Sequence, residues 1–587
     1  MITKMKKYTF LVFHRDYEAF LEQLRTLGVV HITEKASGLT EDPTLQALLQ
    51  KADLLAKVIA QGAPDQLLQE KTDIETRIAT TRKEAERMAV WGDFSAERLS
   101  QLAQAGYSFR YFTCPKKNFQ EEWGIVVAEQ GGLLYCAQVC KAGEAAAELP
   151  DICQEQTLNG KSAADLYKDI DGLNGLLAAQ NARIEAWQKQ HLEEQKQELQ
   201  QIRQQIDWQR VTLNTDTLAE GALKLVEGFC PVDNEPALNA MLDAQHIYYQ
   251  AEDPTNEDNT PIKLRNNWFT RLFECLTGMY GWPTYGEFDP TPVLAPFYLL
   301  FFAMCMGDAG YGLVLILFGL LTYYRKINIS MFEGLGPIIT TLGVGTTVVG
   351  LFLGTFFGMP LADAAWYPDA LKSLIIQGTV MGYDAQMVLA ICIGVFHICL
   401  AMTVKAICYT QRFGFKETIS TWGWLLLIVG GLSAFILLMT FNAPAEVTKW
   451  VLITIASISA LGIYIFNKPG RNPLINIGAG LWDTYNMATG IVGDVLSYVR
   501  LYALGLAGGM LGGAFNDLGM MVLGDHPTWQ WIGCILILLL GHVLNVAMSA
   551  LGAFVHPLRL TFVEYFKNSG YEGKGIKYQP FSKQTTN

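Results

Sequence analysis

The pattern of apolar and polar positions divides the chain near residue 290. Before that point, short apolar runs alternate with charged stretches, whereas after it long apolar runs follow one another with few charges between them. An apolar run at 8–13, an amphipathic stretch at 17–27 and a run at 29–33 predict a small βαβ unit. Together with a second mixed stretch, this pattern predicts α/β lobes near 1–40 and 222–250.

Two longer segments, 45–93 and 161–211, are rich in Leu, Gln, Glu, Lys and Ala at helical spacing. Part of a heptad seam is formed by Ile184, Leu192, Leu199, Ile202 and Ile206. We therefore expect an antiparallel coiled-coil hairpin over 45–211 with a globular tip at 100–155. A 45-residue helix is about 70 Å long, so the hairpin would form a long arm. The pattern fits an arm free in solvent and a strut between other subunits equally well.

Eight apolar segments follow, at 292–306, 308–324, 334–358, 384–408, 419–440, 450–466, 479–520 and 529–566. The first two are contiguous and would form either one long helix or two short ones. Counting them as two puts most loop cations on the cytosolic side, as the positive-inside rule requires. These cations are Arg325, Lys326, Lys405, Arg412, Lys416, Lys468, Arg471, Lys567, Lys574 and Lys577.

This count predicts a cytosolic domain at 1–290 and an α-helical membrane domain at 291–587 with eight transmembrane helices. A multi-pass protein of the cell membrane, with both termini in the cytosol, is expected. The last two spans would be about 63 and 57 Å long, against an apolar bilayer core of about 30 Å. They must therefore tilt, bend or project beyond the bilayer.

Charge and composition narrow the functional classes. The 587 residues carry 44 Lys+Arg against 56 Asp+Glu, and residues 1–290 hold 29 of the former and 43 of the latter. This acidic half argues against a nucleic-acid partner, which would require clustered cations. The eleven cysteines include no CxxC pair, and the chain has no zinc-spaced Cys/His set, nucleotide-binding loop or hydrolase motif. We therefore expect no metal, no cofactor and no catalytic site.

Arg500 lies deep in the seventh span, about 20 residues from either end. Because a guanidinium group does not lose its proton, it needs an anionic partner or a water-filled cavity. An ion pair with Asp494 is the structural alternative to a functional role. Ser497 lies on the same helix face, and a following stripe of small residues, which lets another helix approach closely, is formed by Gly505, Gly509 and Gly513.

A matching stripe of polar and small residues, spaced three and four apart, follows one edge of the last span. It consists of His542, Asn545, Ser549, Gly552, His556 and Arg559. Hydrogen bonding between helices would explain the stripe. Two long helices, each with a polar edge and one arginine, favour a proton or cation path. Glu564 follows as an ionisable group near the cytosolic end.

Two further polar residues have open interpretations. His397, in the fourth span together with Lys405, is either a packed hydrogen-bond donor or a proton relay. Asp308, in the GDAGYG sequence between the first two spans, either caps the following helix or lines an aqueous vestibule.

Six segments carry a family resemblance: EGFCPVDN at 227–234, PTYGEFDPTP at 283–292, FFAMCMGDAGYG at 301–312, SYVRLYALGLA at 497–507, HPLRLTFVEYF at 556–566 and KYQPF at 577–581. With them the chain resembles subunit I, also called subunit a, of bacterial and archaeal rotary V/A-type ATPases. The resemblance implies a non-catalytic stator subunit in the lipid bilayer that forms ion half-channels against a rotating ring of proteolipid (c/K) subunits. It implies contacts of the arm with peripheral-stalk E/G-type subunits and the central-stalk cap (C/d) subunit.

In this resemblance Arg500 and Arg559 match the two intramembrane arginines of the family, and Glu564 matches the glutamate after the second. The glycine stripe would face the moving ring. The chain departs from the family at Ser549, where many members carry glutamate, and at Gly508, where eukaryotic members carry histidine. The outer path would then use His542, Asn545 and His556, and the choice between proton and sodium stays open.

Two other classes of protein remain as alternatives. A secondary ion transporter with a cytosolic regulatory arm would show inverted repeats, and we find no convincing repeat between the two sets of four spans. A membrane receptor that signals through its coiled coil would leave both arginines unexplained.

Overall fold

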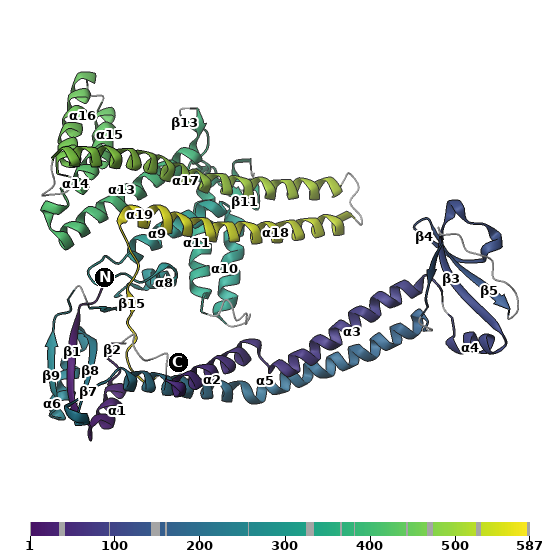
Figure 1. Cartoon of the computed structure of the whole chain (residues 1–587). Helices are drawn as coiled ribbons and strands as arrows, with labels where there is room; N and C mark the ends of the chain where they lie inside the picture. Colours follow the sequence, from purple (N-terminus) through teal and green to yellow (C-terminus); the bar gives the residue numbers. More distant parts are fainter. Residues whose placement is uncertain are drawn as a thin grey trace. The chain divides into compact units, whose positions relative to one another are not determined.

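The computed structural model describes residues 2–33, 42–92, 94–141, 153–158, 161–255, 258–324, 334–363, 367–380, 382–441, 444–466, 473–523 and 530–583. The described chain is mostly helical (Figure 1). It forms two compact units, one made of Met1–Thr33 with Thr215–Lys583, the other built on Glu34–Asn214.

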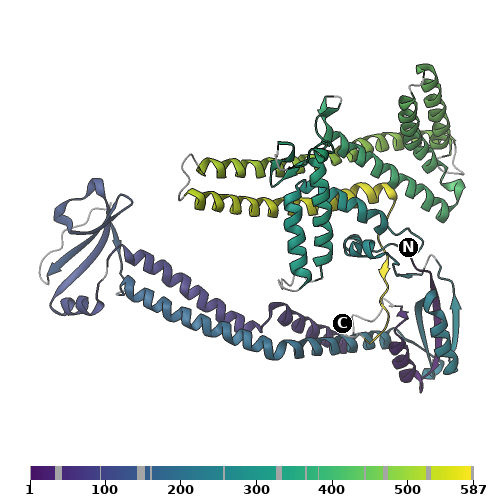
Figure 2. The ribbon, with the colours of Figure 1, turned by 180° about the vertical axis from the view of Figure 1, so that it is seen from behind.

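The second unit is built along one long helix. Two shorter helices pack against it one after the other, and Figure 2 shows them beside it; the three are α2 (Pro43–Gln61), α3 (Asp65–Ala89) and α5 (Ala163–Leu213). Near the end of α5, the predicted seam residues Leu199, Ile202 and Ile206 are buried against Leu45 and Ala52 of α2. Because the start of α5 instead packs on the end of α3, α5 runs antiparallel to both helices.

A four-stranded antiparallel sheet of order β4-β5-β3-β6 lies in the same unit, with α4 (Ala96–Gln104) packed on β3. Its strands are β3 (Tyr107–Pro115), β4 (Ile125–Gln130), β5 (Leu133–Lys141) and β6 (Gln154–Gln156). The Trp91 ring meets the rings of Tyr111 and Tyr135 edge-on, and this contact fixes the sheet to the helices.

The first unit begins with a sheet that joins the two predicted α/β lobes. Its strand order is β2-β8-β1-β9, from β1 (Met5–Phe13), β2 (His31–Ile32), β8 (Leu223–Pro231) and β9 (Tyr248–Glu252), with β7 (Asp216–Leu218) on β8. The helices of this lobe are α1 (Tyr17–Leu27) and α6 (Glu235–Ala244). Both β1 and β2 pair antiparallel with β8, so β8 is inserted into the predicted βαβ unit.

Six of the described helical segments are long and apolar enough to cross a membrane: Gly336–Leu353, Ala385–Phe413, Ile419–Leu438, Glu446–Ile465, Ile475–Leu523 and Gln530–Ser569. Two shorter apolar helices, α9 (Thr291–Met306) and α10 (Ala309–Tyr323), coincide with the first two predicted spans. The count of eight stays a prediction. Several residues that carry the topology argument lie outside the described residues: Arg325, Lys326, Lys468 and Arg471.

Helix α9 forms the centre of the membrane-helix core. It packs against α11 (Gly336–Leu353), α17 (Pro473–Leu523) and α18 (Gln530–Arg559). The rings of Tyr298 and Phe301 are fully buried there. Because α9 is buried on most sides, its apolar residues follow one another without amphipathic spacing.

After the last helix, the chain passes back to the sheet of the same unit. Strand β15 (Ile576–Lys577) pairs in parallel with β10 (Pro261–Ile262). The Tyr578 hydroxyl then donates to the Val29 carbonyl oxygen at 2.6 Å, and the Phe581 amide donates to the Val30 carbonyl oxygen at 2.8 Å. The C-terminal segment therefore ties the end of α18 to the N-terminal sheet.

Replacing Phe581 with alanine should release this segment, because Phe581 is only 6% exposed and a buried Phe→Ala change costs about 3 kcal/mol or more. Hydrogen exchange in peptides covering 24–33 should become faster in the full-length protein. The matched control is Phe13→Ala, since Phe13 is 66% exposed. Equal exchange in both variants would contradict the predicted anchoring.

Candidate functional site

The last two long helices carry most of the predicted site residues. Helices α17 and α18 lie side by side in Figures 1 and 2 and pack extensively on each other. Helix α18 continues through a π-helical turn, η10 (Leu560–Tyr565), into α19 (Phe566–Ser569). Contacts between Gly508 and Ser549, and between Asp494 and Lys567, show that the two helices run antiparallel.

Arg500 lies on α17 without a protein partner for its buried nitrogen. Its Nη1 atom is shielded from solvent and has no hydrogen-bond partner among the described residues. The guanidinium group acts electrostatically on Cys305 of α9 and on His556 of α18. The charge therefore lies where these three helices meet, and it needs an anion that the described residues do not supply.

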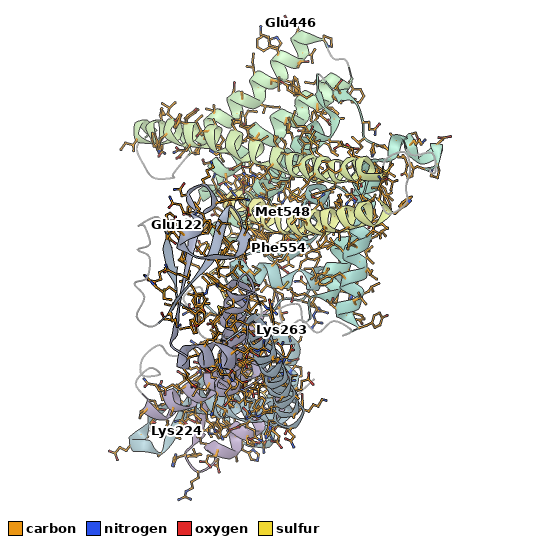
Figure 3. All side chains as sticks on the ribbon, turned by 90° about the vertical axis from the view of Figure 1, so that its right-hand side faces the viewer. Glu122, Lys224, Lys263, Glu446, Met548 and Phe554 are labelled. Carbon is orange, nitrogen blue, oxygen red and sulfur yellow. The ribbon has the colours of Figure 1, made fainter. Side chains whose placement is uncertain are left out.

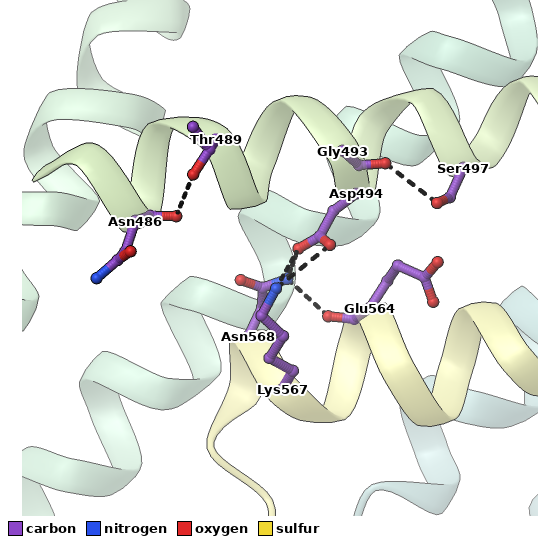
Figure 4. Close-up of polar contacts among 8 residues, drawn as sticks. All are labelled: Asn486, Thr489, Gly493, Asp494, Ser497, Glu564, Lys567 and Asn568. Atoms are coloured by element: carbon purple, nitrogen blue, oxygen red, sulfur yellow. Dashed lines mark hydrogen bonds and ion pairs between the residues drawn. The ribbon is translucent and has the colours of Figure 1, made fainter. Parts of the chain in front are cut away.

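Asp494, the alternative partner of Arg500, binds other groups (Figure 4). Asn568 Nδ2 donates to Asp494 Oδ2 at 2.8 Å, and it also donates to the Glu564 carbonyl oxygen at 2.7 Å. Lys567 Nζ lies 3.4 Å from Asp494 Oδ1. Asp494 is buried and held by these two residues, and the described residues form no Arg500–Asp494 ion pair. An ion pair with Asp494 therefore does not explain the presence of Arg500.

Glu564 is buried beside this cluster, on the π-helical turn, and it is 2% exposed. Its Oε2 atom has no hydrogen-bond partner among the described residues. Figure 4 shows the carboxylate pointing toward Ser497, whose hydroxyl donates to the Gly493 carbonyl oxygen of its own helix at 3.1 Å. An oxygen without a fixed donor leaves this carboxyl group able to exchange a proton with a passing group.

His556 and Arg559 occupy the last turns of α18. His556 Nδ1 is buried without a partner among the described residues, and both Arg500 and Arg559 act on this imidazole electrostatically. Both guanidinium charges are therefore near His556. Arg559 itself is exposed where α18 changes to the π-helical turn.

A chain of hydrogen bonds crosses α10, α17 and α18 on the other side of Arg500. Asn545 Nδ2 donates to the Tyr311 hydroxyl at 2.8 Å, and that hydroxyl lies 2.9 Å from His542 Nδ1. His542 Nε2 lies 3.0 Å from Asn516 Oδ1, and Asn516 Nδ2 donates to the Phe357 carbonyl oxygen at 2.7 Å.

All these bonds are satisfied together when His542 is neutral with its proton on Nε2. Tyr311 then donates to Nδ1, and Nε2 donates to Asn516. A second proton on His542 Nδ1 would turn this nitrogen into a donor, so the Tyr311 hydroxyl would have to redirect its own proton. Proton transfer at His542 is therefore coupled to the Tyr311 hydroxyl.

The two positions that depart from the family pattern face each other. A Cβ atom at Gly508 would lie 3.1 Å from Ser549 Oγ. The Ser549 hydroxyl donates to Asn545 Oδ1 at 3.2 Å, while Asn545 Nδ2 also donates to the Gly508 carbonyl oxygen at 2.9 Å. Ser549 and Asn545 thus extend the Tyr311–His542 chain toward Arg500, and a side chain at Gly508 would displace this arrangement.

We had expected the glycine stripe to face outward. Part of it instead contacts other helices of the same chain. Added Cβ atoms would lie 2.6 Å from the Met304 carbonyl oxygen at Gly505 and 2.9 Å from the Tyr311 hydroxyl at Gly512. Only Gly509 and Gly493, among the α17 glycines from 493 to 513, have nothing within 4 Å. Gly505 and Gly512 therefore make room for α9 and α10 of the same chain, whereas Gly509 leaves open space.

Asp308 acts as a cap. Its Oδ1 accepts from the amides of Gly310, Tyr311 and Phe357, and its Oδ2 accepts from the Gly358 amide, at 2.7–3.1 Å. Four backbone donors therefore use the acceptor positions of this carboxylate, which joins the start of α10 to the turn after α11. The geometry favours the capping role over the vestibule.

His397, on α13 (Ala385–Phe413), is a packed side chain. Its Nδ1 lies 2.9 Å from the Tyr498 hydroxyl, and its ring stacks between Phe297 and Tyr565. Although Nε2 has no partner among the described residues, the ring lies among aromatic side chains rather than along the polar edges of α17 and α18.

Sequence reasoning missed four residues of the site: Tyr311, Asn516, Lys567 and Asn568. Tyr311 was visible in the GDAGYG sequence, and Asn568 follows Glu564 by one helical turn. Neither signal specifies a partner. The described residues also contain no group of three or more His, Cys, Asp or Glu side chains placed to hold a metal ion.

Comparison with known proteins decides the family. The model of the V-type ATPase 116kDa subunit family matches residues 115–356 and 483–583, together more than half of the chain. The chain belongs to this family. Among relatives of this V-type ATPase subunit family member are V-type ATP synthase subunit I 1 of Treponema pallidum, 28% identical with 99% of this chain and 100% of that protein covered, and V-type ATP synthase subunit I of Borreliella burgdorferi, 26% identical with the same coverage.

A-type ATP synthase subunit I of Methanocaldococcus jannaschii is 33% identical over 55% of this chain and 49% of that protein. These relatives confirm the resemblance to subunit I of V/A-type ATPases. The second segment of the chain that the V-type ATPase subunit family model matches is 483–583. It contains both arginines and every site residue on α17, α18 and α19.

Changing Asp308 to asparagine should destabilise this family member, since an amide group would face backbone N–H donors that now bind a carboxylate oxygen. We expect a loss of about 3 kcal/mol, from buried donors left unsatisfied. Thermal unfolding of the detergent-solubilised protein measures it. The control is Asp517→Asn on the exposed side of α17, and equal unfolding midpoints for the two variants would refute the capping role.

Proposed function

We propose that this chain is the ion-translocating, non-catalytic stator subunit in the membrane sector of a rotary V/A-type ATPase. One observation carries the proposal: the unpartnered Arg500 lies between two separate polar clusters on the same helix pair. The outer cluster is Tyr311, Asn516, His542, Asn545 and Ser549. The inner cluster is Asp494, Ser497, Glu564, Lys567 and Asn568.

Each cluster serves as one half-channel. Along α17, Gly508 beside the outer cluster and Asp494 in the inner cluster lie eight and six residues from Arg500, or about 12 and 9 Å at 1.5 Å per residue. Neither cluster includes a hydrogen bond that bypasses the arginine among the described residues. An ion entering one half-channel must therefore pass Arg500 to reach the other.

The partner that completes Arg500 is a carboxylate of a rotating proteolipid (c/K) ring. A guanidinium ion favours the ionised carboxylate over the ion-loaded one, and it keeps its charge at every working pH. A ring carboxylate would therefore release its ion on reaching Arg500, and rotation would carry it to the other half-channel. Arg559 and His556, beside the same position, would guide this exchange.

An apolar face on α18 is available for the ring and the bilayer. Figure 3 shows Met548 and Phe554 on this helix, and Met548 is 62% exposed in the isolated chain. Such a face suits both lipid and a moving apolar partner. The helical unit with α2, α3 and α5 would contact the peripheral-stalk E/G-type subunits and the central-stalk cap (C/d), with both chain termini in the cytosol.

The outer cluster favours protons as the transported ion. It contains no carboxylate, whereas hard cations are bound chiefly by oxygen ligands that include carboxylates. Its His542–Tyr311 pair can accept a proton and pass one on. Asp308, a carboxylate whose charge acts on this pair, is held by four backbone amides.

Arg500→Ala should abolish ATP-driven ion pumping while the complex still assembles, because the ring carboxylate then meets no fixed cation. Pumping is measured in inside-out vesicles or proteoliposomes containing the whole complex. Arg412→Ala, at the exposed end of α13, is the matched control and should pump normally. Undiminished pumping by the Arg500 variant would disprove the proposed function.

Tyr311→Phe should slow pumping roughly a hundredfold, the low end of what a positioned acid–base group contributes. The ring is kept and only the hydroxyl partner of His542 is lost, so assembly should not change. The pH profile of pumping should also shift, since His542 loses the donor that favours its neutral form. An unchanged rate and pH profile would remove Tyr311 from the path while leaving the role of Arg500 intact.

A further inference from the structure

A cavity of about 240 Å³ lies between four helices, beside the inner cluster. Two ammonium groups and three large apolar side chains characterise its lining, which is made by Met402, Lys405, Thr421, Trp424, Met487, Lys567 and Asn568. These residues come from α13, α14 (Ile419–Leu425), α17 and α19. Lys567 and Asn568 also belong to the inner cluster, but the proposed ion path does not explain Lys405 or the apolar lining.

Lys405 is a cation within an apolar helix and has no anionic partner. The described residues place no carboxylate within 4.0 Å of its ammonium group and give it no hydrogen-bond acceptor, although the Tyr409 ring centre lies 5.5 Å away. A cation–π contact leaves its three N–H donors without an oxygen. Charged residues in membrane helices usually pair with a counter-charge, so Lys405 calls for an anion from outside the chain.

Lys567, which also lines the cavity, is held only loosely. Its Nζ lies 3.4 and 3.5 Å from the two oxygens of Asp494, longer than the 2.7–2.9 Å of a strong charge-assisted bond. Asp494 already accepts the shorter bond from Asn568, and the Lys567 side chain is 58% exposed. Lys567 can therefore bind a second anion, and the cavity lining itself contains two ammonium groups and no carboxylate.

The position of the cavity along the helices fits the boundary of a bilayer. Lys405 lies eight residues before the end of α13, or about 12 Å. The whole 29-residue helix is about 44 Å long, against an apolar core of about 30 Å. Thr421 and Trp424 belong to the first turns of the next helix, so they lie near the same boundary.

We propose that this cavity binds the phosphate group of an anionic phospholipid. Lys405 and Lys567 would hold the phosphate oxygens, as basic pockets between membrane helices do on the cytosolic side. Met402, Trp424 and Met487 would cover the glycerol and the first acyl carbons. A free phosphate monoester carries more negative charge, about −1.5 to −2 at pH 7, but it would leave this apolar wall uncovered. The proposal does not depend on the direction or identity of the transported ion.

The test is lipid titration of the detergent-solubilised membrane sector, followed by native mass spectrometry. The probes are dioleoyl phosphatidylglycerol, dioleoyl phosphatidylcholine and glycerol 3-phosphate. Each Lys→Gln change, at Lys405 or Lys567, should weaken phosphatidylglycerol binding about 5-fold, and the double variant about 30-fold, as expected for one cation near an anionic headgroup. Phosphatidylcholine binding should be weaker and less affected.

Two control variants separate this site from other lipid contacts. Lys449→Gln changes an exposed lysine of α16 (Ala445–Ala460), away from the cavity lining, and should bind phosphatidylglycerol as the parent does. A double Lys→Arg variant keeps both charges and should retain binding, which shows that the fold tolerates substitution there.

Two outcomes would overturn the proposal. Equal phosphatidylglycerol affinity in the parent and the double glutamine variant would show that the cavity binds no anionic lipid. Binding of glycerol 3-phosphate as tight as that of the lipid would overturn the lipid as the source of the phosphate.

Discussion

The membrane half of this protein is organised around one permanent charge that the described part of the chain does not neutralise. In an apolar surrounding almost every polar group must find a partner within the protein. Asp308 satisfies four amides, and Asp494 is taken by Asn568 and Lys567. Arg500, by contrast, keeps a buried nitrogen without a partner among the described residues, on the face between α17 and α18. Nearby, a buried nitrogen of His556 and a buried oxygen of Glu564 also have no partner there. Unsatisfied buried groups of this kind mark a place completed by another molecule.

Close approach of helices makes this arrangement possible. Gly505 and Gly512 bring α17 so near to α9 and α10 that a Cβ atom would clash with Met304 or crowd the Tyr311 hydroxyl. The Tyr311 hydroxyl can then reach both His542 and Asn545 on α18. The glycines therefore do more than offer a smooth outer face, because they set the distance at which a side chain from α10 joins the polar edge of α18. The same close approach of helices limits the space at Gly508, where an added Cβ atom would lie 3.1 Å from Ser549 Oγ.

The sequence predicts best what depends on local pattern. The seam at Leu199, Ile202 and Ile206 is found from its heptad spacing, and Arg500 is found because a charge is rare in an apolar run. Contacts between distant segments cannot be predicted in this way. Tyr311 meets His542 across 231 positions of the chain, and the insertion of β8 between β1 and β2 is set by strand pairing. For the same reason, the partner of Asp494 could not be chosen between Arg500 and Lys567 from spacing alone.

The two clusters differ in charge, and this difference has a physical consequence. The outer cluster consists of neutral side chains whose hydrogen bonds can all run in one direction from Asn545 to Asn516. The inner cluster contains the carboxyl groups of Asp494 and Glu564 and one ammonium group, that of Lys567. In the proposed mechanism, a proton would pass between neutral groups in the outer cluster and between carboxyl groups in the inner one. Arg500 lies between the two clusters, so in the proposed mechanism it would act both as an electrostatic barrier to direct passage and as the counter-charge for an ionised group between them.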